Sequence, residues 1–197
     1  STIVGGSTAA RRIGCPGSYG LEQKLPPSLL NQSSSHADEG TAMHAAIEYI
    51  LLNNADVEET YGMEFKKLVI TRAMIDDGIG PAVDYFEALQ DELTASDGDF
   101  EFAVEQHCEM PGIPGAFGTS DIIFKTPKRS GVVDWKFGVG KAVYADDKEG
   151  TPNHQLAFYA RAAMHSRPDM FVDDPAWPVD LHIVQPRCYD AEPHRAY

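Results

Sequence analysis

The segment Asp134-Trp135-Lys136, which follows the apolar run 130–133, carries the residue types in this chain that are best suited to chemistry. Side chains alternate between the two faces of a strand, so Asp134 and Lys136 are expected to project together from one face. A carboxylate and an ammonium group at the end of a buried strand are costly unless they pair or serve a site. The pattern therefore indicates either a strand-end ion pair or a functional site.

Asp121 supplies a second acid, 13 residues before Asp134 and inside the apolar segment 118–124. Two adjacent strands joined by a turn over 126–131 would bring both acids close together. Carboxylates suit Mg²⁺ or Mn²⁺, which favour oxygen ligands, and the carbonyl of Trp135 can complete the protein side of such a site. The cation would polarise a phosphate and acidify water, while Lys136 stabilises charge that develops on phosphorus. The three residues together favour a hydrolytic metal site over a surface aspartate beside an ion pair.

Two helical pairs add groups that such a site uses. Gln155 and Tyr159 stand at i and i+4 on the helix expected after the Asp-x-Lys strand, where an amide and a phenol reach a phosphate or a water molecule. His44, one turn before Glu48 on an earlier helix, is a candidate ligand for a divalent cation, Mn²⁺ in particular. Each pair alone is more typical of an ordinary helix edge, so its value rests on the neighbouring acids.

The elements that must position these residues form a helical first half and a strand-rich second half. Residues 1–35 are rich in Gly, Ser and Pro and predict an irregular arm with one short helical turn near 7–12. The order of helices, three strands in a meander, one helix and a last strand predicts a mixed sheet flanked by helices. The expected helices are 41–54, capped by Thr41, 63–76, 81–93 and 152–165, with Gly78-Ile79-Gly80 separating the second and third, and the expected strands are 100–106, 117–125, 131–137 and 179–184, with a turn at 111–115.

The composition is that of an ordinary globular protein, with 197 residues, 43% of them hydrophobic and 23% charged. No apolar run approaches the length of a membrane span, and no signal-peptide pattern is visible, so no membrane partner is expected. Three cysteines, Cys15, Cys108 and Cys188, form no C-x-x-C pair. An odd and sparse set of this kind favours a reducing, cytoplasmic setting.

The net charge of −14 argues against strong binding of nucleic acid through its phosphates. The local charge differs, because Asp134 is the only acid between positions 125 and 141. A basic rim around the site would allow weak, salt-sensitive binding of DNA. The five basic residues of this rim are Lys125, Lys128, Arg129, Lys136 and Lys141.

Taken in order and spacing, these motifs resemble the RecB-type nucleases of the PD-(D/E)XK superfamily, most closely their phage-encoded exonuclease-like branch. The resemblance covers roughly residues 36–186. Ser120 stands where the superfamily name has proline, a common relaxation. The matching pieces are Glu39-Gly40-Thr41-x-x-His44, Gly118-Thr119-Ser120-Asp121, Asp134-Trp135-Lys136 and Gln155-x-x-x-Tyr159, with Cys15-Pro16-Gly17-Ser18 and Val184-Gln185-Pro186-Arg187 near the two ends.

The resemblance implies a fold, a reaction and a role for each matched residue. The implied fold is an α/β/α sandwich with a small central mixed sheet, a restriction-endonuclease-like core with extra N-terminal helices, in one nuclease domain over 36–197. The implied reaction is Mg²⁺- or Mn²⁺-dependent hydrolysis of DNA phosphodiesters by an exonuclease of phage recombination or DNA processing. The implied metal ligands are His44, Asp121, Asp134 and the Trp135 carbonyl, the implied catalytic residues are Asp121, Asp134, Lys136, Gln155 and Tyr159, and Glu105 is a weaker candidate for a substrate contact.

Several parts of this expectation stay open. Linear duplex and single-stranded DNA are both candidate substrates, a recombination protein is a candidate partner, and the oligomeric state is undetermined. No iron–sulfur cluster is expected, because only Cys15 and Cys188 match the four cysteines that some relatives carry. No closing element is visible after residue 186, which predicts a domain shortened at its C-terminus. The alternatives to an exonuclease are a non-catalytic nuclease fold that binds DNA or protein and a structure-specific endonuclease.

Overall fold

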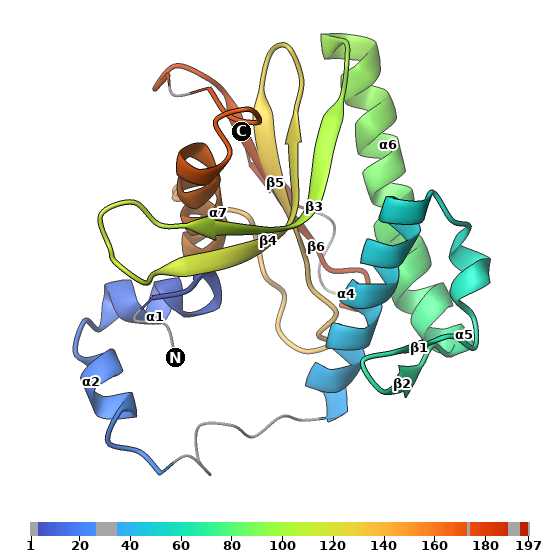
Figure 1. The fold of residues 1–197 in the computed structure, drawn as a ribbon, viewed down its shortest axis with the longest axis horizontal. Coiled ribbons are helices and arrows are strands. Elements are labelled where there is room, and N and C mark those ends of the chain that lie inside the picture. The colour runs from blue at the N-terminus through green and yellow to red at the C-terminus, as the bar shows by residue number, and fades with distance from the viewer. Residues whose placement is uncertain (1–3, 27–34, 173, 189–193, 197) are drawn as a thin grey trace.

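A five-stranded mixed sheet lies at the centre of the computed structural model, which describes residues 4–26, 35–172, 174–188 and 194–196 (Figure 1). The strand order is β3-β4-β5-β6-β7, in which β3, β4 and β5 form an antiparallel meander. β6 runs parallel to β5, and β7 pairs with β6 antiparallel. The bounds are β3 (Glu101–Glu109), β4 (Phe117–Lys125), β5 (Ser130–Trp135), β6 (Val179–Val184) and β7 (His194–Ala196).

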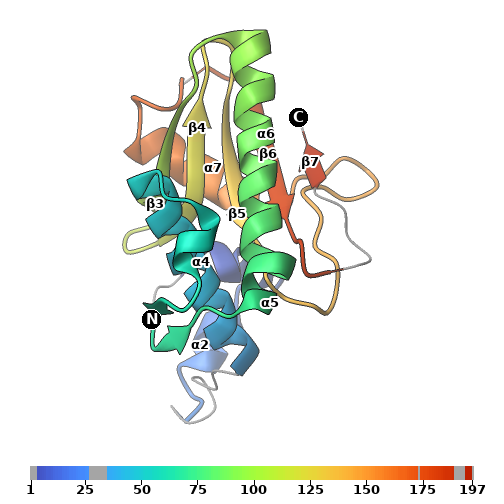
Figure 2. The same ribbon diagram turned by 90° about the vertical axis from the view of Figure 1, so that its right-hand side faces the viewer.

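Helices cover both faces of this sheet (Figures 1 and 2). On one face, α4 (Ser35–Asn53) and α6 (Gly80–Asp97) pack over a buried cluster that includes Ile122 and Val133. On the other, α7 (His154–Ser166) and α1 (Ala9–Gly14) pack over a cluster that includes Ile123 and Val132. The arrangement confirms the expected α/β sandwich with a mixed sheet.

The alternation of side chains decides which layer receives the two predicted acids. Ile123 of β4 and Val132 of β5 belong to the cluster beneath α7. Asp121 and Asp134 are each two positions from one of these residues, so their side chains leave the strands on the same side. Asp134 accordingly meets Gln155 of α7. Asp121 lies where the β4–β5 pairing ends at Ile122 and Val133, so its carboxylate can also reach the α4 side of the sheet.

The N-terminal arm is more ordered than its composition predicts. It contains η1 (Gly6–Thr8), α1 and α2 (Ser18–Glu22), of which only the first two match the expected helical turn near 7–12. Ala9 is fully buried among side chains of the α7 layer. The arm thus contributes to the core on the side of the sheet that α7 covers.

The helix expected over 63–76 is wrong. This stretch forms a two-stranded hairpin, β1 (Glu64–Phe65) and β2 (Leu68–Val69), followed by the short α5 (Arg72–Met74). Lys66 and Lys67 have φ angles of 51° and 70°, a conformation that closes a tight turn and ends a helix. Phe65 and Leu68 face each other across the hairpin and pack against the core beside α4. They are three positions apart in the sequence, so over so few residues their spacing resembles that of one helix face.

The sequence suggested that Gly78-Ile79-Gly80 separates two helices, but the structure has no break there. The π-helix η3 (Ile75–Ile79) leads directly into α6, which has Pro81 in its first turn as expected. A Cβ at Gly78 would lie 2.8 Å from Met43 Sδ, so this glycine allows close packing against α4. The glycines therefore serve helix packing, which a single sequence does not distinguish from a break.

Two further boundaries differ from expectation. α4 begins at Ser35, and Thr41 is not its cap, because its hydroxyl donates to the carbonyl of Ala37 at 2.9 Å inside the helix. The C-terminal stretch expected to lack a closing element contributes β7 to the edge of the sheet. Another short element, η2 (Val57–Thr60), follows α4. In the part of the chain that is described, no helix combines the length and apolarity needed to cross a bilayer.

Candidate functional site

Three acidic residues lie in one row across β3, β4 and β5. The β3–β4 pairs Val104–Ile122 and Gln106–Ser120 flank Glu105 and Asp121, so the register brings these two acids next to each other. The β4–β5 register, continued by one position, places Asp121 opposite Asp134. Opposite residues of antiparallel strands point to the same face, so the row gathers three carboxylates at one place in the sheet. Like charges this close repel one another unless a cation or protons neutralise them.

The backbone at Glu105 is distorted where this row crosses β3. Glu105 has a φ of 50°, in the left-handed region that a residue with a side chain seldom adopts, and it drops out of the strand pairing. The β3–β4 hairpin bends sharply, and its far half lies across α7 (Figure 1). Strained conformations of this kind persist where the surrounding structure holds them and often occur at functional sites.

Asp121 is held by groups from two other elements. His44 of α4 has its Nδ1 3.2 Å from Asp121 Oδ1. The backbone amide of Trp135 donates to Asp121 Oδ2 at 2.7 Å. In an extended strand the N–H and C=O of one residue point to the same neighbour, so the Trp135 carbonyl is also directed toward β4. The helix layer and the strand layer therefore meet at this carboxylate.

His44, Glu105 and Asp121 have the geometry of a cation site. Each offers one ligand atom, and the three atoms lie within 4.8 Å of one another. Ligands on opposite sides of a Mg²⁺, Mn²⁺ or Ca²⁺ ion are separated by roughly 4 to 5 Å, so one ion can contact all three. Two carboxylates and one imidazole also match the donors that Mn²⁺ accepts.

Asp134 lies beside this trio and belongs to a second network. Its Oδ2 is 2.6 Å from Lys136 Nζ, and its Oδ1 accepts a hydrogen bond from Gln155 Nε2 at 3.3 Å. Lys136 Nζ also donates to Gln155 Oε1 at 3.0 Å. Asp134 is only 3% exposed, and among the described residues its Oδ2 accepts no hydrogen bond of good geometry. A buried carboxylate oxygen in that state can accept a cation.

Tyr159 completes the second network from the next turn of α7. The Gln155 amide lies 2.8 Å from the Tyr159 hydroxyl. The ring is held between two glycines, because a Cβ at Gly118 would lie 2.7 Å from it and one at Gly6 only 2.1 Å. Gly6 belongs to the N-terminal arm and Gly118 to β4. The absence of side chains at both positions thus creates the space that the ring occupies.

The acidic row shifts the pKa values of its members. Burial, followed by the charge of Asp121, raises the pKa of Glu105 to about 7 and that of Asp134 to about 6, the latter despite Lys136. Burial opposes protonation of His44, but the hydrogen bond and charge of Asp121 outweigh it and raise the His44 pKa. Burial raises the pKa of the Tyr159 phenol, which stays neutral at physiological pH. The carboxylates of Glu105 and Asp134 and the His44 imidazole therefore hold protons more tightly than isolated side chains would.

The structure brings the residues singled out from the sequence into two adjoining groups. Asp134, Lys136, Gln155 and Tyr159 form one network, while His44 and Asp121 form the other, with Trp135 between them through its amide. The difference from the expected ligand set is that Glu105 joins His44 and Asp121, whereas Asp134 is directed toward Lys136.

Glu105 was expected only as a weaker candidate for a substrate contact, whereas the structure groups it with His44 and Asp121. Its signal was present, because Glu105 lies eight residues before Ile113 and Asp121 lies eight residues after it. A hairpin centred on the turn at 111–115 must therefore place the two acids opposite each other.

Three of the five residues of the expected basic rim, Lys125, Lys128 and Arg129, lie away from the site. Lys128 and Arg129 lie in the β4–β5 turn, where Lys128 Nζ is 3.6 Å and Arg129 Nε 2.8 Å from Asp97 at the end of α6. Lys125 donates to the carbonyl of Asp169 at 2.8 Å. This turn joins the ends of β4 and β5 that lie away from Asp121 and Asp134. Because a strand rises by about 3.3 Å per residue, the four positions between turn and acids keep the basic side chains away from the carboxylates.

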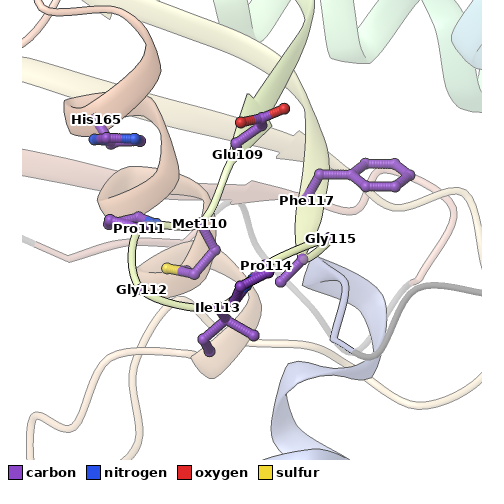
Figure 3. Close-up of a pocket in the computed structure, with 10 residues that line it drawn as sticks. Glu109, Met110, Pro111, Gly112, Ile113, Pro114, Gly115, Phe117 and His165 are labelled. Atoms are coloured by element: carbon purple, nitrogen blue, oxygen red, sulfur yellow. The ribbon is translucent and has the colours of Figure 1, made fainter.

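A cavity of about 320 Å³ lies apart from both networks, at the tip of the β3–β4 hairpin. Figure 3 shows its wall, which the loop from Met110 to Phe117 forms together with His165 of α7. None of the residues in the two networks lines it. This cavity therefore has no evident part in the chemistry of the acids.

Comparisons with known proteins include a solved structure and a family model. A structure titled "Crystal structure of SSO0001" is 15% identical, with 91% of this chain and 76% of that chain covered, but a TM-score of 0.28 supports no argument about fold or function. The family model described as "Protein of unknown function (DUF2800)" matches residues 2–194. This match spans nearly the whole chain, and the chain therefore belongs to the DUF2800 family.

Proposed function

We propose that this protein is a divalent-metal-dependent deoxyribonuclease of the RecB type within the PD-(D/E)XK superfamily, acting as an exonuclease in phage recombination or DNA processing. The observation that carries the proposal is the junction of the two networks. A cation-sized group of His44, Glu105 and Asp121 adjoins a buried Asp134–Lys136 pair that α7 holds through Gln155. A cytoplasmic setting and a recombination partner belong to the same proposal.

The cation would be held by His44, Glu105 and Asp121, with Asp134 and the Trp135 carbonyl beside them. When bound, Mg²⁺ or Mn²⁺ supplies Lewis acidity toward phosphate oxygens and water. The rise in the pKa of Glu105 and Asp134, caused by burial and then by the charge of Asp121, fits this role, because a bound cation would favour the ionised carboxylates.

Lys136 is the group of this chain best placed to act on the phosphate. Its ammonium contacts Asp134 at 2.6 Å and Gln155 at 3.0 Å, which hold it at the edge of the cation site. From there it can donate to a non-bridging phosphate oxygen while water adds to phosphorus and the ester oxygen leaves with a proton. Tyr159 positions Gln155 through the 2.8 Å contact and stays neutral.

A cleavage assay on end-labelled linear duplex and single-stranded DNA, with Mn²⁺, Mg²⁺ or chelator, tests the proposal. We expect metal-dependent release of nucleotides and a loss of about 10²- to 10⁴-fold on substitution Lys136→Ala, the range for a group that stabilises developing charge. The matched control is Lys24→Ala, which changes an exposed lysine outside both networks. Metal-dependent cleavage at the full rate by Lys136→Ala would remove the assigned role.

The same assay, with covalently closed circular DNA added as a substrate, separates the two alternatives. A non-catalytic binding module shows no turnover on any DNA with either metal, an outcome that the net charge of −14 makes worth testing. A structure-specific endonuclease cuts covalently closed circular DNA, whereas an exonuclease leaves it intact.

A further inference from the structure

A large groove opens next to the Lys136–Gln155 network. It has a volume of about 990 Å³ and lies between the N-terminal arm, at Gly6 to Ala10, and the loop 141–153 with the first residues of α7. This volume is at the upper end of ligand-binding pockets in proteins. Apart from Gln155, the residues that line the groove have no part in the proposed chemistry.

The groove is continuous with the catalytic network through two residues. Gln155 lines it and also contacts Lys136 and Asp134. Gly6 lines it on the opposite wall and packs directly against the ring of Tyr159. A ligand in the groove therefore approaches the amide that holds the lysine.

The loop that forms one wall is fixed by a buried amide. Gln185, only 3% exposed at the end of β6, accepts a hydrogen bond from the amide of Val143 at 2.9 Å. Its Nε2 donates to the carbonyls of Gly138 at 3.0 Å and Lys141 at 3.2 Å. Three bonds to one side chain hold this part of the loop in place, so the groove wall is formed before any ligand arrives.

The side chains that this wall presents suit an unpaired strand of nucleic acid. Tyr144 is 44% exposed and offers an aromatic surface for a base. Lys141 and Lys148 are exposed and can each take a phosphate. Asp146 and Asp147 balance their charge, and the Asp147 carboxylate is engaged by the amides of Glu149 and Thr151. Binding must then depend on stacking of a base more than on charge. Duplex DNA cannot bind in this way, because its bases are paired and stacked on one another.

We propose that this groove binds single-stranded nucleic acid, with a base stacked on Tyr144, and delivers the strand to the site at Lys136. The inference rests on the proposed function for what happens to the strand but not for its binding. Of the two candidate substrates, linear duplex and single-stranded DNA, this inference favours single-stranded DNA. Two lysine–phosphate contacts predict a shallow salt dependence, with a slope of log K against log salt of about −1.4.

Fluorescence anisotropy with a fluorescein-labelled dT₁₂ strand and a duplex of the same length tests this inference. Chelator is present, so that no cleavage occurs whatever the function. We expect dT₁₂ to bind more tightly than the duplex and Tyr144→Ala to weaken dT₁₂ binding by about 5- to 100-fold, the effect of losing one stacked base. Tyr144→Phe keeps the ring and should stay within about twofold. Tyr61→Ala is the matched control, because Tyr61 is an exposed tyrosine, 57% accessible, outside the groove.

Two results would overturn the inference. One is unchanged dT₁₂ binding by both Tyr144→Ala and Lys148→Ala in proteins whose melting curves match the wild type. The other is duplex binding that is as tight as dT₁₂ binding and equally sensitive to Tyr144. Failure of the proposed function differs from both, because it would appear as Tyr144-dependent binding of dT₁₂ without metal-dependent cleavage of any DNA.

Discussion

Replacement of Glu105 by glutamine is expected to change stability in opposite directions without and with metal. In the metal-free protein, the ionised Glu105 carboxylate is repelled by Asp121 and partly removed from water, so its neutral isostere should stabilise the fold. In the metal-loaded protein, Glu105 supplies one of three ligand atoms, so the same substitution should remove stability. Glutamine is as compatible as glutamate with the φ of 50° at this position.

The size of the metal-free effect follows from the pKa of Glu105. A pKa of about 7 in place of 4.5 means that ionisation destabilises the folded state by at most about 3 kcal/mol. The side chain is partly exposed, and solvent screening reduces this to about 1–2 kcal/mol. The penalty is absent below about pH 4.5, develops as pH rises, and is complete above about pH 7. At pH 8, Glu105→Gln should raise the melting temperature by about 2–8 °C.

Thermal melting with chelator and with Mn²⁺, at pH 4.5 and pH 8, measures both effects. Mn²⁺ at about 100 times its dissociation constant stabilises the wild type by about 2.7 kcal/mol, or roughly 5–10 °C, and should stabilise Glu105→Gln far less. Glu101→Gln, an exposed glutamate on the same strand, is the control and should change neither value. A lower melting temperature for metal-free Glu105→Gln at pH 8, or an undiminished Mn²⁺ shift, would refute the reasoning.

Two further predictions concern turnover. The rate of cleavage should rise with pH between about 6 and 8, because Asp134 and Glu105, with pKa values near 6 and 7, must lose their protons before a cation can bind; a flat pH–rate profile over this range would contradict that requirement. Gly118→Ala should lower kcat by about tenfold or more with little change in KM, because its Cβ would lie 2.7 Å from the Tyr159 ring and displace the group that positions Gln155. Gly138→Ala is the control, since a Cβ there meets nothing within 4 Å, and equal kinetics for the two variants would count against the positioning role of Tyr159.

Local patterns in the sequence were sufficient to predict that the side chains proposed for the site lie close together. The period of two in β4 and β5 placed Asp121, Asp134 and Lys136 correctly relative to one another, and the i,i+4 spacing on α7 paired Gln155 with Tyr159. These relations depend only on strand and helix geometry over short distances, which is the same in every protein. The mixed sheet followed from the order of the elements for the same reason.

Only the tertiary structure decided which distant groups join that centre. His44 reaches Asp121 because α4 packs across the opposite face of the sheet, and Gly6 contacts Tyr159 because the arm folds onto α7. Lys128 and Arg129 were assigned to the wrong place because sequence proximity to Asp134 does not show which end of a hairpin they occupy. Such contacts join residues far apart in the chain, and they arise from the burial of whole helix faces that no local pattern contains.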